Sequence, residues 1–330
     1  MQMVLVVVLV AGAYLLLPQL VGVGDALQVL RQLSLPCVAG ALGMQAVSVL
    51  AHAHVVQESL RIFGHALSFA SVLEVSLASS FATLLLPSVG LSGLAVRCRY
   101  LGERGCSVGA TGVAFTIEAL AQAAAHTSMV TVAVAYRLLR GRQPPWAAVI
   151  LILSVTLFTA AALAALLAKP SKRDWRYRIL RVVNGLRHRG GRPIISESAV
   201  EGRLAALQSS VQQVGAGAAR RLLICSIVRN SGAVMALYLV LRALDRQPAL
   251  SAVALSFSCA DVLGGMSSLP AGLLVAETSL SALLNRTGVP LAIAVTGTLV
   301  FRLISLWLPR ALGLLAWVHL QRRSKKPLWS

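Results

Sequence analysis

Four ionisable residues lie in or beside apolar segments of the chain, where a charge is costly: Arg97, Glu118, Glu277 and Arg302. A charged side chain at the centre of a membrane-spanning helix costs about 2.5–3.5 kcal/mol on insertion scales. Such residues therefore usually face the protein interior, pair with one another or line a substrate path. We expect Glu277 to pair with Arg302 or Arg97. A buried structural salt bridge, without a binding role, is the alternative for the same residues.

The two arginines suit an anionic ligand. Each guanidinium group can bind a phosphate through two parallel hydrogen bonds, and the glutamates could receive a proton or a cationic headgroup. We therefore expect Arg97, Glu118, Glu277 and Arg302 to form a site for substrate binding or translocation. No nucleophile elbow, P-loop, dinucleotide fingerprint or zinc-protease motif accompanies them. The sequence favours a non-enzymatic protein, and a membrane enzyme with Glu74 or Glu118 as its base is the weakest hypothesis.

Two apolar stretches are interrupted by proline and glycine in a similar way. The first interruption contains Pro87 and Gly90, and the second contains Pro270 and Gly272. At membrane depth, the freed backbone groups must be satisfied by protein or by a water-filled cavity. Helix N-termini that follow the two prolines could also donate N–H groups to an anion. Paired interruptions in the two halves of a membrane protein predict a transporter-type site.

The spacing of these interruptions indicates a weak internal repeat. A shift of 183 residues superimposes Pro87 on Pro270 and Gly105 on Gly288, and a span rich in small residues follows each glycine. The broken segments 87–104 and 270–287 either re-enter the membrane from one side or cross it as short helices. The repeat is inverted or parallel depending on which of these holds.

The composition predicts an all-α polytopic membrane protein. Of the 330 residues, 57% are hydrophobic and 12% are charged, whereas soluble domains have about 45–50% and 25%. The apolar runs are about 20 residues long, which is the length of a spanning helix. We predict one domain over residues 1–330, with about eight transmembrane helices and the two broken segments. The expected spans are 3–23, 35–56, 66–86, 108–136, 146–168, 220–241, 249–269 and 289–318.

The net charge of +19 is best explained by the membrane rather than by nucleic acid, because the basic residues flank apolar spans. Residues 169–219 form a basic loop with an amphipathic helix near its end, and 321–330 form a basic tail. We expect the loop to be cytoplasmic and the protein to lie in the plasma (inner) membrane. The residues expected at the membrane surface are Lys172, Arg173, Trp175, Arg176 and Arg178.

The remaining polar residues give weaker signals. The five cysteines are scattered, so neither a metal site nor a disulfide framework is expected, and no cofactor is indicated. His52 and His54 are placed at a span end, as interfacial residues. Arg229 is expected to reach the membrane surface from near a helix end. Glu74 and Asp261 are further ionisable residues within spans.

The two motifs resemble those of the lysylphosphatidylglycerol synthase transmembrane-region family, whose members are often called flippase-like. The first motif corresponds to Pro87, Gly90, Arg97 and Gly105, and the second to the segment Pro270 to Glu277 with Gly288 and Arg302. Ala271 and Leu274 replace two glycines of the second motif, which affects how closely a ligand can approach the backbone. The resemblance implies a multi-span flippase-like fold. No segment of the chain matches the soluble aminoacyl-transferase domain of some members.

Two functions follow from these observations. The first is a bacterial flippase-like protein that binds or translocates an anionic phospholipid or a polyprenyl-linked glycolipid between leaflets. The alternative is a non-transporting membrane subunit that docks a separate lipid synthase or glycosyltransferase through the basic loop. The expected partners are membrane lipids with anionic headgroups and a lipid-modifying enzyme. Nucleic acid is not an expected partner.

Overall fold

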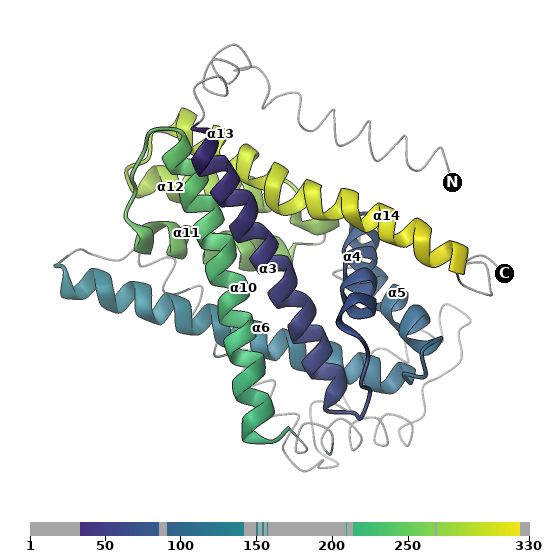
Figure 1. Ribbon diagram of the computed structural model, residues 1–330. Helices are drawn as coiled ribbons and strands as arrows, with labels where there is room; N and C mark the ends of the chain where they lie inside the picture. Colours follow the sequence, from purple (N-terminus) through teal and green to yellow (C-terminus); the bar gives the residue numbers. More distant parts are fainter. Residues whose placement is uncertain are drawn as a thin grey trace, which may run out of the picture.

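The regular structure is entirely helical in the residues that the computed structural model describes, which are 34–85, 91–141, 214–267, 269–323 and the isolated positions 150, 154, 157 and 209 (Figure 1). The first helices are α3 (Leu35–Arg61), α4 (Phe69–Leu85), α5 (Leu91–Gly102) and α6 (Val108–Leu139). The later ones are α10 (Ala216–Ala243), α11 (Leu250–Met266), the short turn η2 (Pro270–Gly272), α12 (Val275–Arg286), α13 (Leu291–Arg302), the π turn η3 (Leu303–Trp307) and α14 (Leu308–Arg323).

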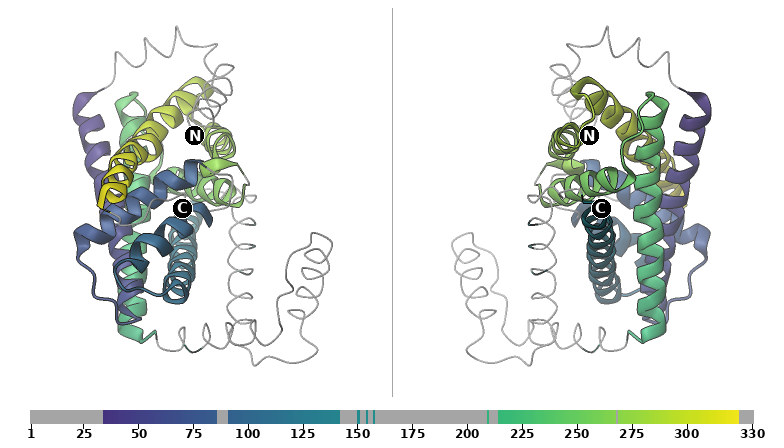
Figure 2. Two further views of the ribbon diagram at one scale, coloured as in Figure 1. Left: turned by 90° about the vertical axis from the view of Figure 1, so that its right-hand side faces the viewer. Right: turned by 90° about the vertical axis from the view of Figure 1, so that its left-hand side faces the viewer.

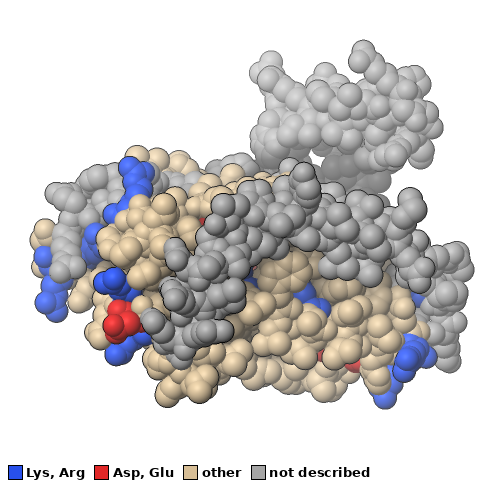
Figure 3. All heavy atoms as spheres, turned by 90° about the horizontal axis from the view of Figure 1, so that it is seen from above, with Lys and Arg blue, Asp and Glu red and all other residues tan. Residues whose placement is uncertain are grey.

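Four helical elements are long and apolar enough to cross a membrane: α3, α6, α10 and the continuous element 291–323. Their bounds lie within five residues of the predicted spans. On the face in Figure 3, the visible Lys and Arg gather mainly toward the left and right sides of the molecule. The described helices are therefore those of an integral membrane protein. The spans 3–23 and 146–168 lie almost entirely outside the described residues, as do Pro87, Gly90, most of the basic loop and the tail after Arg323.

The internal repeat is visible in helix lengths and in backbone hydrogen bonds. Helices α3, α4, α5 and α6 have 27, 17, 12 and 32 residues, and α10, α11, α12 and the final element have 28, 17, 12 and 33. The turn before the last helical element of each repeat has the same backbone hydrogen bond, at positions 183 residues apart. Cys106 N–H donates to the carbonyl of Leu101, and Val289 N–H to that of Leu284. Gly105 and Gly288 have φ of 86° and 98° in these turns, a conformation that glycine adopts readily.

The two repeats are inverted with respect to each other, because the corresponding helices α3 and α10 pack antiparallel. Ser34, before α3, donates its N–H to the carbonyl of Ala243 at the end of α10, over 3.3 Å. At the opposite ends, Arg221 of α10 and Glu58 of α3 form a salt bridge of 2.8 Å. In Figure 1, α3 runs downward and α10 upward, with α4 and α5 on one side and α11 and α12 on the other. Helices α3 and α10 lie side by side in both views of Figure 2 as well.

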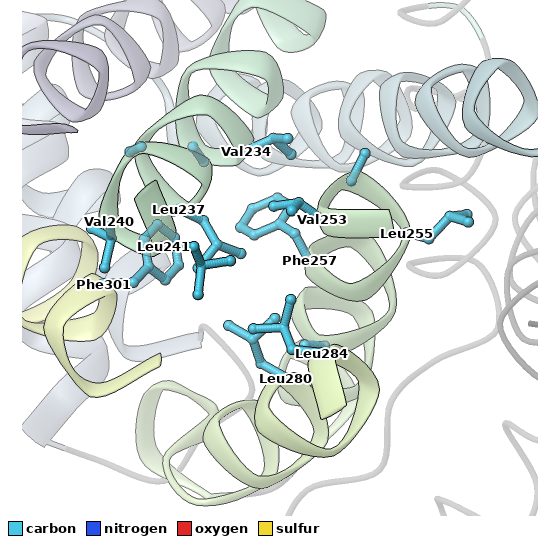
Figure 4. Close-up of a cluster of buried hydrophobic side chains, with 14 of the residues drawn as sticks. Val234, Leu237, Val240, Leu241, Val253, Leu255, Phe257, Leu280, Leu284 and Phe301 are labelled. Carbon is cyan, nitrogen blue, oxygen red and sulfur yellow. The ribbon is translucent and has the colours of Figure 1, made fainter. Parts of the chain in front are cut away.

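Each repeat has its own apolar core, and each core includes a helix from the other repeat. In the second repeat, Leu237 of α10, Phe257 of α11, Leu280 of α12 and Phe301 of α13 are buried in one cluster (Figure 4). Residues of α6 join this cluster, and Leu320 of α14 joins the core of the first repeat. Correspondingly, α4 packs on α14 and α11 packs on α6. Because α6 packs on the second repeat and α14 on the first, these two long helices hold the halves together.

Candidate functional site

Two buried ion pairs occupy related positions in the two repeats, with their charges reversed. In the second repeat, Glu277 on α12 accepts a hydrogen bond of 2.5 Å from Nε of Arg302 on α13. In the first, Arg97 on α5 donates a hydrogen bond of 2.6 Å to Glu118 on α6. Glu277 thus pairs with Arg302, one of the two partners expected for it. Arg97 pairs with Glu118 and not with Glu277.

Arg97 and Glu118 have further buried partners. The Arg97 guanidinium also donates to Ser79 Oγ at 3.1 Å and lies 3.3 Å from His52 Nε2. Ser59 donates to the Glu118 carboxylate at 3.1 Å. Arg97 and Glu118 are only 5% and 8% exposed. Because these groups are paired and enclosed, this pair anchors α5 to α6 in the structure.

A cavity of about 250 Å³ lies between the two repeats. Helices α3, α4, α6, α10 and α11, the turn η2 and the final helical element all contribute to its lining, and more than half of the lining residues are polar. Several polar atoms of these residues are buried without a hydrogen-bond partner within the described part of the chain. They include Gln45 Oε1, Ser76 Oγ, Asn230 Nδ2 and Arg310 Nε. A polar ligand or water in the cavity would satisfy such atoms.

The cavity has an excess of positive charge. Arg229, Arg302 and Arg310 line it, with Asp261 as the only lining carboxylate among the described residues. Arg302 is paired with Glu277, and Asp261 with His126. For Arg229 and Arg310, no carboxylate lies within salt-bridge distance in the described ranges. Two guanidinium charges are therefore left for an anionic ligand.

The π turn η3 brings Arg302 and Arg310 to the same side of their helix. Residues eight apart in a regular α-helix are rotated by about 80°, whereas residues seven apart are rotated by only about 20°. A π turn takes up one additional residue, so Arg310 occupies the angular position of a residue seven beyond Arg302. Both side chains line the cavity, together with Ser305 and Pro309 between them. Single π turns in α-helices occur frequently at functional sites.

The second Pro/Gly interruption forms part of the cavity wall. Ala271 lines the cavity, and its carbonyl lies 3.5 Å from Nη2 of Arg302. Gly272, Ala271 and Leu274 all have positive φ, at 68°, 53° and 68°. A Cβ on Gly272 would lie 2.7 Å from the carbonyl oxygen of Gly264. Glycine is thus required at 272 by space and by conformation, whereas Ala271 and Leu274 adopt a conformation that costs L-residues free energy.

A polar network crosses from α6 to α10 and α11 beside the cavity. Gln122 Nε2 donates to Asn230 Oδ1 over 2.6 Å and lies 3.0 Å from His126 Nε2. The same imidazole nitrogen lies 3.0 Å from Asp261 Oδ2. Since α6 belongs to the first repeat and α10 and α11 to the second, this network links the two halves at the cavity.

The structure corrects two sequence predictions. Arg229 is near the middle of α10 and lines the cavity, so it does not extend from a helix end to the surface. His52 is not at the end of a helix, because α3 continues to Arg61, and it lines the same cavity. Glu74 lies 3.6 Å from His319 and 4.0 Å from Arg104, and it does not line the cavity.

Sequence reasoning missed His126, Gln122, Asn230 and Arg310. All four lie within predicted spans, where any strongly polar group is a candidate functional residue. Arg310 follows Arg302 in the last apolar segment, and this pairing was the available signal. The proposed surface residues from Lys172 to Arg178 lie outside the described residues. The five cysteines form no disulfide with one another, and burial raises the pKa of the Cys106 thiol in the turn between α5 and α6.

The described residues define an α-helical integral membrane protein with two inverted repeats around a polar cavity rich in arginine. The chain belongs to the lysylphosphatidylglycerol synthase transmembrane-region family, whose model matches residues 3–313. It is thus a membrane protein of a family associated with lipid metabolism or transport. No curated protein matches the chain with significance.

Proposed function

We propose that the cavity binds the anionic headgroup of a phospholipid or polyprenyl-linked glycolipid, and that the protein moves this lipid between leaflets. The observation that carries the proposal is the pair of guanidinium groups, Arg229 and Arg310, that face the cavity without a carboxylate partner among the described residues. A phosphate would form charge-assisted hydrogen bonds with them. Arg302, held by Glu277 and by the carbonyl of Ala271, presents a third guanidinium in a fixed position.

The size of the cavity favours a headgroup over a whole lipid. Pockets for drug-sized ligands have volumes of about 300–1,000 Å³, and this cavity has about 250 Å³. A phosphate with a small polar substituent would fit, while the acyl or prenyl chains stay in the surrounding bilayer. The role proposed for the cavity is therefore binding and movement, without covalent chemistry.

The inverted repeat favours transport over simple binding. Inverted halves that enclose a central site are common in transporters, where one half rocks against the other and exposes the site alternately to each side. We propose about eight spans for the whole chain, with 169–219 on the cytoplasmic side of the plasma (inner) membrane. Helices α5 and α12, of 12 residues each, are about 18 Å long and shorter than the hydrocarbon core. We therefore propose that each is a broken segment within the bilayer.

A scrambling assay in liposomes tests this function. Full-length protein is reconstituted with fluorescent phosphatidylglycerol, and dithionite reports how fast lipid leaves the inner leaflet. We expect Glu277→Ala and Arg302→Ala to reduce the rate at least tenfold, because the first frees the Arg302 guanidinium from its fixed position and the second removes it from the cavity. Arg286→Gln is the matched control: it lies on the same helix as Glu277 but at the exposed end, and its rate should equal that of the wild type.

Unchanged scrambling in Glu277→Ala and Arg302→Ala would reject the flippase proposal. If the protein is instead a membrane subunit that docks a lipid synthase or glycosyltransferase through its basic loop, the opposite result is expected in cells. Removal of 172–192 would then abolish function, whereas the two cavity variants would remain active.

A further inference from the structure

His126 and Asp261 form an acid–base pair at the cavity that the binding of a headgroup does not by itself require. His126 is 6% exposed, and its Nε2 lies 3.0 Å from Asp261 Oδ2. The Asp261 side chain is 47% exposed and lines the cavity. A proton can therefore reach the pair from the cavity through the carboxylate. Chains of Asp, Glu and His within membrane helices commonly carry protons.

The hydrogen bonding of His126 gives this proton two alternative positions. A neutral imidazole nitrogen either donates one hydrogen or accepts one. In the ionised pair Nε2–H donates to the Asp261 carboxylate, so a further proton can bind either at Nδ1, giving an imidazolium, or at the half-exposed carboxyl group of Asp261. Nδ1 of His126 is buried and has no partner within the described residues. A second proton on the ring would therefore have no acceptor in the described part of the protein.

The charged groups around this pair come from several helices. Arg229 on α10 and Arg302 on α13 line the same cavity as Asp261, and Glu277 on α12 neutralises Arg302. His52 on α3 also faces the cavity, but its Nε2 lies beside Arg97 of α5, which can only donate, so this nitrogen must accept. Arg310 on α14 also lines this cavity, and of the two guanidinium groups there without a carboxylate partner in the described ranges it is Arg229 that interacts with the Asp261 carboxylate through its charge.

We propose that the His126–Asp261 pair binds a proton that is coupled to headgroup binding. With the cavity free of anion, Arg229 stabilises the ionised carboxylate. An anionic headgroup takes over Arg229 and adds a negative charge beside Asp261, so the pair takes up one proton from water. This inference rests on the proposed function, because it requires an anion in the cavity. Linkage is reciprocal, and protonation of the pair therefore strengthens anion binding.

The test measures protons and binding in the same samples. Full-length protein in mild detergent is titrated with dihexanoyl-phosphatidylglycerol in weakly buffered solution containing a pH indicator, and affinity is measured between about pH 5 and pH 8. We expect uptake approaching one proton per bound lipid, and an affinity that rises by up to about tenfold for each unit of decreasing pH. Asp261→Asn, which keeps an oxygen for His126, should bind the lipid without proton uptake.

The control is His319→Gln, which removes a half-exposed histidine beside Glu74, away from the cavity. It should take up protons as the wild type does. If wild-type protein binds the lipid without proton uptake and with an affinity independent of pH, coupling is rejected while the headgroup site stands. If Asp261→Asn keeps the full uptake, the proton binds elsewhere and the assignment is rejected. If the wild type binds no lipid at all, the proposed function and the coupling both fail.

Discussion

At the scale of single residues, the two repeats place an ion pair between their short helix and their last helix, but they reverse its polarity. Arg97 and Glu118 are enclosed by further hydrogen bonds, whereas Arg302 also faces the cavity. One duplicated arrangement therefore serves two purposes. The first pair holds α5 on α6, and the second positions a guanidinium group where an anion can reach it.

The anchoring role of the first pair predicts a strong difference between single and double variants. Arg97→Met leaves the Glu118 carboxylate buried and unpaired, which should cost about 3–5 kcal/mol of unfolding free energy. The double variant Arg97→Met/Glu118→Leu removes both charges and should recover most of this loss. Unfolding of the purified protein by SDS in mixed micelles measures both. Equal losses in the single and double variants would show that the pair does not anchor α5.

Sequence reasoning reached part of this arrangement. The cost of charge in an apolar span identified Arg97, Glu118, Glu277 and Arg302. The opposite charges at the ends of the two motifs, an arginine in the first and a glutamate in the second, were also evident from the sequence. It did not identify the partner of Arg97, because helix packing alone decides whether Glu118 or Glu277 is in reach. Arg229 was misplaced although it lies near the middle of both the expected span and α10, because the sequence does not show which face of a helix lines a cavity.

At the scale of elements, the interruption at Pro270 is a tight turn with three residues at positive φ. Only one of the three is glycine. The family motif has glycine at the positions of Ala271 and Leu274, and the backbone conformation gives the physical reason for that preference. This chain keeps the turn because Gly272 packs on the backbone of Gly264, and because the Ala271 carbonyl contacts Arg302.

Two neighbouring substitutions should consequently act in opposite directions. Ala271→Gly relieves the left-handed conformation and should stabilise the protein by up to about 1 kcal/mol. Gly272→Ala places a Cβ against the backbone of Gly264 and should destabilise it by about 2–4 kcal/mol. Thermal unfolding in detergent reports both changes as shifts in Tm of opposite sign. Shifts of the same sign would contradict this account of the turn.

The elements themselves were largely predictable, because apolar length alone marks a spanning helix. The π turn at Leu303–Trp307 was not predictable. Nothing in the local composition distinguishes it from a regular helical turn, and tertiary packing selects it. Its consequence, the alignment of Arg302 with Arg310, was missed for the same reason.

At the scale of the whole molecule, the antiparallel packing of α3 and α10 makes the repeat inverted. The sequence alone left this open, since the direction of each repeat depends on the number of crossings between them. The hydrogen bond from Ser34 to Ala243 and the salt bridge from Arg221 to Glu58 fix the direction of the two helices. If α3 and α10 cross the bilayer, the axis that relates the repeats lies in the membrane plane.

This arrangement predicts the side on which each helix end lies. With loop 169–219 in the cytoplasm, the start of α10 and the end of α3 are cytoplasmic. In a cysteine-free background, an impermeant maleimide should label Ser34→Cys and Gln247→Cys in intact cells. It should label Ala66→Cys only after the membrane is permeabilised. All three positions are exposed, so access depends on the membrane alone. The reverse pattern would place the basic loop outside.

The central claim is that the arginines of the cavity bind an anionic lipid headgroup, and native mass spectrometry tests it most directly. Full-length protein is equilibrated with equal amounts of phosphatidylglycerol and phosphatidylcholine in mild detergent, beside the double variant Arg229→Gln/Arg310→Gln. Each charged hydrogen bond contributes about 1.5–3 kcal/mol, so we predict phosphatidylglycerol bound to the wild type with at least tenfold weaker binding in the variant. Equal occupancy by phosphatidylglycerol in both proteins would contradict the claim.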